Sequence, residues 1–428
     1  MVDNALIPED VARAVIDPSA YGDGARVQNA FAWLRANNPL GRAELEGFEP
    51  FWIVSKHADI LEISRQNDLF RSGERSTTFT NKEADARVRQ RTGGSPHLLR
   101  TLVQMDAPDH PKYRLLTQSW FLPQNIRPLE ERIRQIARDH VDRMIELGGE
   151  CDFARDIALT YPLRVIMQVL GVPPEDEPRM LQLTQELFGA SDPELNRSRS
   201  NVGENPDAMA DLQAIIADFF MYFKRLTDAR KAEPRSDLAT VIANGQIDGA
   251  PISDFEAMSY YVIVATAGHD TTSSSTAGAI WGLAEAPEQF ARLKADPSLI
   301  PGLVDESIRW VTPVKHFMRT ATAPYELRGR KIEPGDWFWL AYPSGNRDEE
   351  VFEAPNEFRV DRNPNRHLAF GYGAHLCLGQ HLAKMEMRIL WEELLPRLDS
   401  LELAGAPALA VASFVGGPKR LPIRYRMH

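Results

Sequence analysis

A glycine-rich stretch around one cysteine, residues 370–379, carries the clearest chemical signal in this sequence. It reads FGYGAHLCLG, with Cys377 near its end. We expect Gly371, Gly373 and Gly379 to allow positive φ angles and a close approach of the backbone to a flat surface. A helix predicted to begin just after the cysteine would direct its N–H groups at the sulfur, and such groups stabilise a thiolate. The stretch therefore predicts a thiolate ligand to iron held in a flat macrocycle, a ligand that favours O–O cleavage.

Two plainer interpretations of this stretch stay open on the residues alone. Cys377 could be a buried core cysteine in a glycine-rich turn, or it could join His375 and His381 in a zinc site that lacks a fourth ligand. Cys151 is the only other cysteine in the sequence. A multi-cysteine zinc or iron–sulfur cage is therefore excluded, and a reduced, cytoplasmic setting is expected.

A second stretch, residues 267–272, reads AGHDTT and places polar side chains within an apolar helix. A glycine inside a helix costs roughly 1 kcal/mol relative to alanine, so we expect Gly268 to open space for dioxygen. Thr271 could exchange its local hydrogen bond for one to water or dioxygen. Asp270 could relay protons, and an acid beside an alcohol suits the two proton transfers of monooxygenation. The plainer interpretation is a kinked helix with a polar face, and His269 receives no chemical role.

The elements that must position these stretches are mostly helical. One long helix is predicted over residues 254–284, because Ser253 can cap it and Pro287 lies just beyond its end. Its middle is apolar almost all round and should be buried. A last helix is predicted directly after Cys377.

The rest of the chain predicts a mainly α protein with a smaller β-rich part, organised as a single domain over residues 1–428. The further predictions are a strand at 51–56 with a helix after it, a long functional loop over 68–102, amphipathic helices between 111 and 188, a polar hinge over 191–207, and strands with glycine and proline turns after 313.

Charge and hydropathy exclude several classes of partner. The formal charge is −11, with 60 acidic and 49 basic residues, and such a surface disfavours nucleic acid. The longest apolar run, at residues 260–267, is far shorter than the ~20 residues of a membrane-spanning helix, so no membrane association is expected. The first 30 residues have no apolar core and do not resemble a signal peptide.

Together these stretches resemble the signatures of the cytochrome P-450 family. The resemblance runs from about residue 51 to the C-terminus and includes ATAGHDTTSSS, NRHLAFGYGAHLCLGQHLAKMEM and SFVGGPK. The wording is similar to that of bacterial class I members of the α-terpineol hydroxylase family. The resemblance implies the P-450 fold, a triangular helical body around one haem b, with Cys377 as the axial ligand and with Asp270 and Thr271 handling protons and oxygen. The residues that it places against the haem are Phe370, Gly371, Gly379, Ala267 and Gly268.

A charged pair on a predicted helix, Glu306 and Arg309, stands three residues apart. By itself such a pair contributes only ~0.2–0.5 kcal/mol and is common on surfaces. By resemblance it is the Glu-x-x-Arg motif, which joins Arg362 in a buried network that braces the cysteine stretch. That role is structural and not catalytic.

Haem propionates require cationic or hydrogen-bonding partners inside a protein. Three family positions that contact propionates are matched by His110, Arg319 and His375. Arg114 lies four residues after His110, on the same helical face, and is a fourth candidate. Each of these residues alone would be a solvated surface group.

The residues expected to line a substrate pocket are aliphatic or aromatic, so the substrate should be small and apolar and bound largely by burial. A terpenoid and an aromatic hydrocarbon both fit. The lining residues expected from their place relative to the haem are Leu99, Leu102, Val264, Ala267, Val311, Val314, Phe317, Phe414 and Val415.

Electrons must come from another protein, because the sequence has no flavin or nicotinamide fingerprint. We expect a two-iron iron–sulfur ferredoxin with its reductase as the donor, and a monomeric chain. The basic residues that could dock an acidic ferredoxin are Lys112, Arg114, Arg366 and Arg388. Two other functions stay open: a peroxide-driven peroxygenase, and a haem-based sensor or carrier that would need no proton relay.

Overall fold

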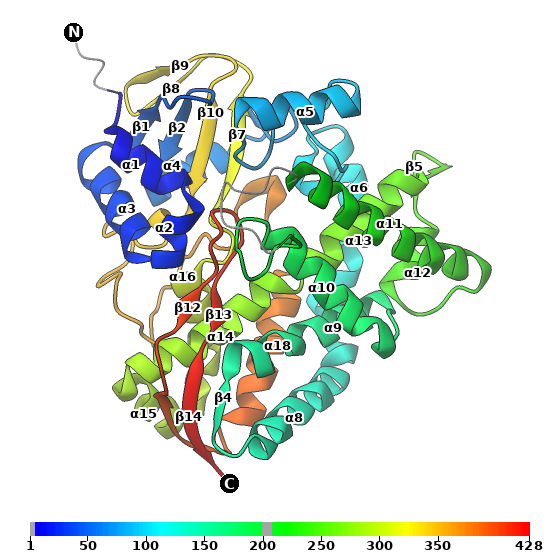
Figure 1. Cartoon of the computed structure of the whole chain (residues 1–428), viewed down its shortest axis with the longest axis vertical. Coiled ribbons are helices and arrows are strands. Elements are labelled where there is room, and N and C mark those ends of the chain that lie inside the picture. The colour runs from blue at the N-terminus through cyan, green and yellow to red at the C-terminus, as the bar shows by residue number, and fades with distance from the viewer. Residues whose placement is uncertain (1–4, 199–207) are drawn as a thin grey trace.

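Helices make up most of the molecule, one group of strands lies beside the N-terminal helices, and another runs toward the C-terminus at the bottom of the view (Figure 1). The computed structural model describes residues 5–198 and 208–428. Its helices are α1 (Glu9–Ile16), α2 (Pro18–Asp23), α3 (Ala25–Asn37), α4 (His57–Arg65), α5 (Lys82–Thr92), α6 (Asp109–Gln118), α7 (Pro123–Ile126), α8 (Glu130–Glu146), α9 (Thr160–Leu170), α10 (Glu177–Phe188), α11 (Ala208–Ala232), α12 (Leu238–Ala243), α13 (Asp254–Ala267), α14 (Asp270–Glu285), α15 (Pro287–Ala295), α16 (Ile300–Val311), α17 (Tyr342–Gly345) and α18 (Gln380–Leu394).

The strands confirm the β-type patterns near residue 51 and after residue 313. They are β1 (Leu40–Ala43), β2 (Phe51–Val54), β3 (Phe70–Arg71), β4 (Glu150–Asp152), β5 (Gln246–Ile247), β6 (Ala250–Pro251), β7 (His316–Ala321), β8 (Tyr325–Leu327), β9 (Arg330–Ile332), β10 (Trp337–Ala341), β11 (Leu398–Leu403), β12 (Ala408–Leu409), β13 (Pro418–Arg420) and β14 (Pro422–Met427).

The largest sheet has the strand order β1-β2-β10-β7-β3 and is buried on both faces. Successive side chains of a strand point to opposite faces. Trp337 and Trp339 of β10 accordingly pack with the α1–α3 layer, while Phe338 and Leu340 pack toward α4. Leu368 joins the α4 side of this core, so the sheet anchors the chain just before the cysteine stretch.

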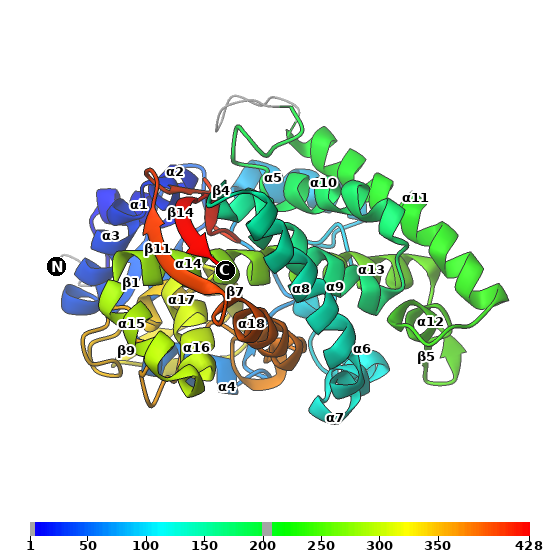
Figure 2. The same cartoon turned by 90° about the horizontal axis from the view of Figure 1, so that it is seen from below.

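The largest apolar core lies among α8, α9, α11, α13, α14 and α18. Figure 2 shows α13 and α14 crossing the middle of the molecule one after the other. The helix that follows the cysteine, α18, packs against α8 and α16. The AGHDTT stretch thus lies where α13 ends and α14 begins, and the cysteine stretch leads directly into α18.

The single long helix predicted over 254–284 is wrong in one respect, because it is two helices with a break at Gly268 and His269. Ser253 does cap the first helix, in a capping box with Glu256. At the break the Thr271 hydroxyl donates to the Ala267 carbonyl (2.7 Å), so a side chain closes the gap in the backbone ladder.

One loop prediction is partly wrong, and another falls partly outside the described residues. The region 68–102 is not an irregular loop throughout, since it contains β3 and α5, and α5 has no buried residue. The polar hinge predicted over 191–207 lies partly outside the described residues. Among the described residues, no helix combines the length and the apolar character needed to cross a membrane.

Candidate active site

The cysteine stretch folds back on itself between the sheet and α18. The Cys377 N–H donates to the Phe370 carbonyl (2.9 Å). Gly371 and Gly373 have φ of 68° and 74°, as predicted. A Cβ on Gly373 would lie 2.0 Å from the Ser64 carbonyl oxygen, so only glycine fits against α4. The prediction is wrong for Gly379, whose φ is −86° because the backbone is already turning into α18.

The Cys377 thiol lies among hydrogen-bond donors. Burial raises its pKa, while the N–H groups of Gly379 and Gln380 and the charge of Arg114 act in the opposite direction. These are the N–H groups at the start of α18 that the sequence predicted would face the sulfur. The side chain of Cys377 remains half-buried among neighbours that are likewise half-buried. The sulfur therefore borders an internal space that the protein itself does not fill.

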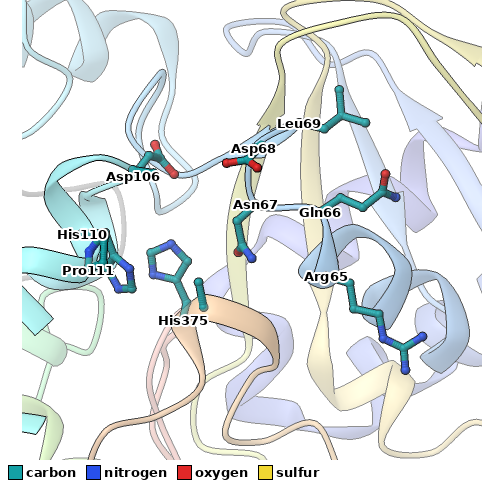
Figure 3. Close-up of a pocket in the computed structure, with 11 residues that line it drawn as sticks. Arg65, Gln66, Asn67, Asp68, Leu69, Asp106, His110, Pro111 and His375 are labelled. Atoms are coloured by element: carbon teal, nitrogen blue, oxygen red, sulfur yellow. The ribbon is translucent and has the colours of Figure 1, made fainter. Parts of the chain in front are cut away.

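His110 and His375 lie next to each other beside this loop (Figure 3), and the charges of Arg319 and Arg114 are close to His375. The His110 and His375 rings lie 4.3 Å apart between centroids. The Arg114 guanidinium donates to the Leu376 carbonyl (2.8 Å), and Arg319 is buried with a bond to the Met318 carbonyl. Burial, followed by the charges of Arg319, His110 and Arg114, lowers the pKa of His375 well below its usual value. The structure thus brings the four proposed propionate partners together.

A pocket of about 460 Å³ opens beside this cluster and is lined by the residues drawn in Figure 3. His110 and His375 line one side, and the end of α4 with Asn67 lines the other. Asp106 also lines it, with its carboxylate bonded to the backbone N–H groups of Ser72 and Gly73. The cluster is therefore reached from the surface.

One face of the broken central helix is open. Val264, Gly268 and Thr271 are half-buried and Ala267 is exposed, whereas the other residues from Tyr260 to Thr276 are mostly buried. Residues four apart share a helix face, so these side chains border one space. Gly268 does not open it, since a Cβ there would lie 2.7 Å from Ile166 of α9. The glycine allows α9 to pack closely, and the expectation that it makes room for dioxygen is wrong; Ala267 faces the space.

Asp270 and Thr271 stand at the start of α14, beside this space. The Asp270 side chain is 16% exposed, and its Oδ2 has no hydrogen-bond partner among the described residues. The Thr271 hydroxyl is bonded to the Ala267 carbonyl, as described for the helix break. An acid with an unpartnered oxygen among the described residues and an alcohol with one local hydrogen bond thus lie next to each other.

The Glu306–Arg309–Arg362 network is buried and braces the cysteine stretch indirectly. Arg309 donates to both oxygens of Glu306 (2.7 Å each), and Arg362 donates to the same carboxylate (3.0 Å). Arg309 also donates to the carbonyl of Asn346, whose amide oxygen accepts from the Leu368 N–H (2.6 Å). Burial favours a higher pKa for Glu306, but bonds from Arg309 hold it below its usual value.

Apolar side chains from three segments meet near the C-terminus. Phe317 and Phe414 contact edge to face with centroids 5.5 Å apart, and Val314 pairs with Val415 in an isolated bridge. Phe188, at the end of α10, lies 6.3 Å from Phe414. The sequence did not single out Phe188, because nothing local connects it to residue 414. We call these five residues the aromatic cluster.

The other predicted lining residues lie outside the aromatic cluster. Leu99, Leu102 and Val264 belong to the main core. Val311 packs into a notch on α14, where a Cβ on Gly278 would lie 2.1 Å from its Cγ2. The structure therefore directs Val311 at α14 more than at the aromatic cluster.

Comparison with known proteins agrees with this geometry. A family model of cytochrome P450 matches residues 75–404. The chain is 51% identical over 421 residues to cytochrome P450-terp from Pseudomonas sp, with 98% of each chain covered.

The chain belongs to the cytochrome P450 family.

Further relatives extend the comparison to structure and activity. CYP108D1 from Novosphingobium aromaticivorans matches with a TM-score of 0.90 and 48% identity, over 99% of this chain and 100% of that chain. Linalool 8-monooxygenase from Pseudomonas putida is 32% identical over 397 residues, which cover 92% of this chain and 94% of that protein. The chain has the P450 fold and is a P450 monooxygenase, an oxidoreductase whose cofactor is haem b.

The residues of this P450 fit a haem. The Nε2 atom of His110 is buried without a hydrogen-bond partner among the described residues. Burial lowers the pKa of His375 most, followed by the charges of Arg319, His110 and Arg114, and two propionates would offset that positive charge. No group of three or more metal-binding side chains occurs in the described parts of the chain, which leaves the zinc interpretation without support.

A buried acid that the sequence analysis missed, Glu386 of α18, lies near the oxygen-handling residues. It is 2% exposed, the Thr272 hydroxyl bonds to its carboxyl, and its Oε2 has no partner among the described residues. Burial raises its pKa well above the usual value, against a smaller lowering by Thr272. A lone acid between Met385 and Met387 is the signal that could have revealed it.

We expect Glu386→Gln to stabilise the holoprotein more at pH 8 than at pH 5. A carboxyl with a raised pKa in the folded state contributes its full stability below its unfolded pKa and loses it as the pH rises through the folded pKa. Glutamine keeps the shape without the charge, so the free energy of unfolding should rise by about 1–3 kcal/mol at the higher pH.

Urea unfolding of the two holoproteins at both pH values measures this difference. Glu131→Gln, on the exposed face of α8, is the matched control and should change neither value. An equal effect of Glu386→Gln at both pH values would contradict the raised pKa.

Proposed function

We propose that this P450 hydroxylates a small apolar substrate, a terpenoid in preference to an aromatic hydrocarbon, with electrons from a two-iron ferredoxin and its reductase. The aromatic cluster carries the substrate part of the proposal. Its walls are apolar, and the ammonium of neighbouring Lys315 is turned to the carbonyls of Val311 and Thr312 (2.9 Å each). Such a pocket binds by burial of apolar surface.

The relatives favour the terpenoid over the aromatic hydrocarbon. One is a linalool 8-monooxygenase and another is cytochrome P450-terp. These names refer to the relatives themselves. They support a terpenoid for this chain because the residues of its aromatic cluster are of the type that a branched hydrocarbon contacts.

Titration of the ferric holoprotein with α-terpineol, linalool and naphthalene tests the substrate class. We expect a spin-state change in the Soret band at low concentrations of a terpenoid and a weaker one with naphthalene. Phe414→Ala should weaken terpenoid binding by about 10-fold or more, since a buried phenylalanine contributes about 1.5–3 kcal/mol. A stronger response to naphthalene than to either terpenoid would reverse the assignment.

Each residue of the site has a proposed role in this reaction. Haem, when bound, supplies the activation of dioxygen at a thiolate-ligated iron. Cys377 would supply the thiolate that holds the iron, and Gly371 and Gly373 would allow the loop backbone to lie close to the haem. The Thr271 Oγ1 can give up its bond to the Ala267 carbonyl and hold dioxygen or water instead. The Asp270 side chain is 16% exposed and can take a proton from water there and pass it on.

The propionates are proposed to bind His110, Arg114, Arg319 and His375. The Glu306, Arg309 and Arg362 network holds the chain that leads into the cysteine loop. We further propose that the chain acts in the cytoplasm as one monomeric unit around a single haem. Sedimentation of the holoprotein tests the oligomeric part of this proposal.

The proposed ferredoxin contact rests mainly on one arginine. Lys112 is paired with Asp248, Arg388 with Glu130 and Glu392, and the Arg114 side chain is turned inward to Leu376. Three of the four basic residues expected to dock the donor are therefore engaged within the chain itself. Arg366 is exposed, and its side chain makes no hydrogen bond to other described residues.

We expect Arg366→Glu to raise the KM for an acidic ferredoxin by about 5- to 10-fold at low ionic strength, because it reverses a charge at the docking surface. The effect should shrink at high salt, where exposed charges are screened. Lys331→Glu, on β9, changes the same charge on an exposed strand of another sheet and should leave the KM unchanged. Equal effects of the two variants would remove Arg366 from the docking surface.

A peroxide-driven peroxygenase is the second function considered from the sequence, and no observation here favours it. Supplying hydrogen peroxide without ferredoxin separates the two functions. We expect product formation to be slower by at least about 10-fold than with ferredoxin and reductase, because Asp270 and Thr271 suit a reaction that needs protons delivered.

A further inference from the structure

Asp192, in the turn after α10, is a fully buried acid that the proposed reaction does not use. Its Oδ1 and Oδ2 lie 3.0 Å and 2.9 Å from Nζ of Lys419, on β13. The Val411 N–H donates to Oδ2 (2.8 Å), and the Glu194 N–H donates to Oδ1 (2.9 Å). The carboxylate thus binds one cation and two backbone N–H groups out of contact with solvent.

The bonds of Asp192 connect the two segments that carry the outer rings of the aromatic cluster. Its own N–H donates to the carbonyl of Gly189 (2.8 Å), the residue after Phe188, at which α10 ends. On the other side, Val411 stands three residues before Phe414. Asp192 is therefore bonded to both chain segments whose rings, Phe188 and Phe414, lie 6.3 Å apart between centroids.

The ion pair is better explained by placement than by stability. A buried ion pair typically adds little net stability compared with apolar residues of similar volume, because both charges lose their hydration. Lys419 is nearly buried and also contacts Glu194 (2.9 Å). Donors from residues 411 and 419 converge on one carboxylate that is over two hundred residues away in the sequence, so their main effect is to fix how the two segments lie relative to each other.

The segment that carries Phe414 is also held from its other side. The Lys315 N–H donates to the Phe414 carbonyl (2.7 Å), and Nδ1 of His316 lies 2.9 Å from the Ser413 carbonyl oxygen. Loss of the Asp192 carboxylate should therefore displace the ring at the end of α10 and leave Phe414 in place.

We propose that Asp192 is a positioning residue for the substrate, whose bonds to Val411 and Lys419 hold the ring of Phe188 against Phe414. The proposal rests on the aromatic cluster being part of the pocket in the proposed terpenoid hydroxylation. Both rings are half-buried, so each keeps a surface that a substrate can contact. Without the carboxylate the end of α10 moves away from residue 411, and a bound terpenoid loses its contact with Phe188.

Spin-state titration of the ferric holoprotein tests the proposal, with α-terpineol or the probe that gives the largest response. We expect Asp192→Ala to raise the Kd by about 2- to 10-fold, the range that one aromatic contact contributes. Cyanide, a small ligand of the iron that needs neither ring, should keep its wild-type Kd. Asp192→Asn keeps an acceptor for the Val411 N–H and should recover part of the loss. An unchanged Kd for the terpenoid in Asp192→Ala, or an equal rise for cyanide, would overturn the proposal.

A double variant shows whether the acid acts through the ring. The Kd of Asp192→Ala with Phe188→Ala should equal that of Phe188→Ala alone, because the contact that Asp192 maintains is then already absent. Multiplied effects would contradict the proposal. If Phe414→Ala leaves terpenoid binding unchanged, the proposed pocket itself fails. If Phe414→Ala weakens binding and Asp192→Ala does not, only this inference fails.

Asp237, which caps α12, is the matched control. It too is a nearly buried acid that pairs with a cation, Arg230 (2.6 Å), and accepts from a backbone N–H, that of Thr240 (2.8 Å). We expect Asp237→Ala to lower the stability of the holoprotein and to leave the Kd of the terpenoid unchanged. A rise equal to that in Asp192→Ala would show that a general loss of stability is responsible and that positioning is not.

Amide hydrogen exchange of the substrate-free holoprotein gives a result that needs no substrate. We expect faster exchange in Asp192→Ala in the peptides that contain Phe188 and Val411, because local contacts that oppose opening are lost there. Asp237→Ala should change neither peptide. Unchanged exchange in both peptides would overturn the proposal. If Asp192→Ala does not bind haem, the same comparisons on Asp192→Asn, which keeps the shape of the side chain, decide the outcome.

Discussion

The Cys377→His holoprotein should lose the ferrous–carbonyl spectrum of a thiolate-ligated haem and all measurable hydroxylation. The sulfur is the ligand proposed to donate electron density that favours O–O cleavage, and an imidazole donates less. The loss of activity should exceed the roughly 10–100-fold that removal of an outer partner of a metal ligand typically costs. Carbonyl difference spectra and product formation with ferredoxin measure the two effects.

Cys151 provides the matched control for this experiment. It is buried on β4, where its thiol contacts Tyr425, far in sequence from the cysteine loop. Cys151→Ala should keep the thiolate spectrum and turnover and lose at most about 1–2 kcal/mol of stability, as small core truncations do. A thiolate-type spectrum in Cys377→His, or its loss in Cys151→Ala, would contradict the assignment of the ligand.

Thr271→Ala should uncouple reduction from hydroxylation. The variant is expected to consume dioxygen and electrons at a comparable rate and to release hydrogen peroxide in place of product. A positioned proton donor typically contributes 10²–10⁴-fold, so product per electron pair should fall by at least about 10-fold. Parallel measurement of product, peroxide and electron consumption gives this ratio directly.

Two control variants test whether the loss of coupling is due to the Thr271 hydroxyl. Thr271→Ser keeps a hydroxyl able to reach the Ala267 carbonyl and should retain most of the coupling. Thr276→Val, further along α14, removes a buried hydroxyl that has no partner among the described residues, and should not affect coupling. Full coupling in Thr271→Ala would exclude its proposed role and would return the haem sensor or carrier to consideration.

Cys377 and Thr271 have different proposed roles, so their variants should fail in different ways. Loss of the ligand removes the spectrum as well as the activity, whereas loss of the hydroxyl should leave the spectrum and redirect the products. Measuring both variants with one ferredoxin therefore separates ligation from oxygen handling.

Several positions were open to prediction because their chemistry is encoded within a few residues. Gly371 and Gly373 adopt the positive φ that a tight loop beneath a flat group requires. Ser253 caps its helix with Glu256 three residues later, a local pattern that needs no distant partner. The pair Glu306 and Arg309 was visible for the same reason.

Other features depend on residues that are far apart in the chain. Gly268 serves the close approach of Ile166, about a hundred residues earlier, and not the binding of dioxygen. Phe188 meets Phe414, and Thr184 and Leu159 meet His269, only because α9 and α10 pack across the helix break. No spacing in the sequence could reveal these contacts, since each side chain by itself is ordinary.

By itself, the sequence determined the family, the cysteine that can ligate the metal and the acid–alcohol pair, because each is written in a short segment whose local geometry follows from residue type. The tertiary structure decided where the central helix breaks, which side chains surround the Asp270 carboxyl and which rings meet in the aromatic cluster. Those outcomes follow from long-range packing, in which burial and hydrogen-bond satisfaction are settled among segments and not within them.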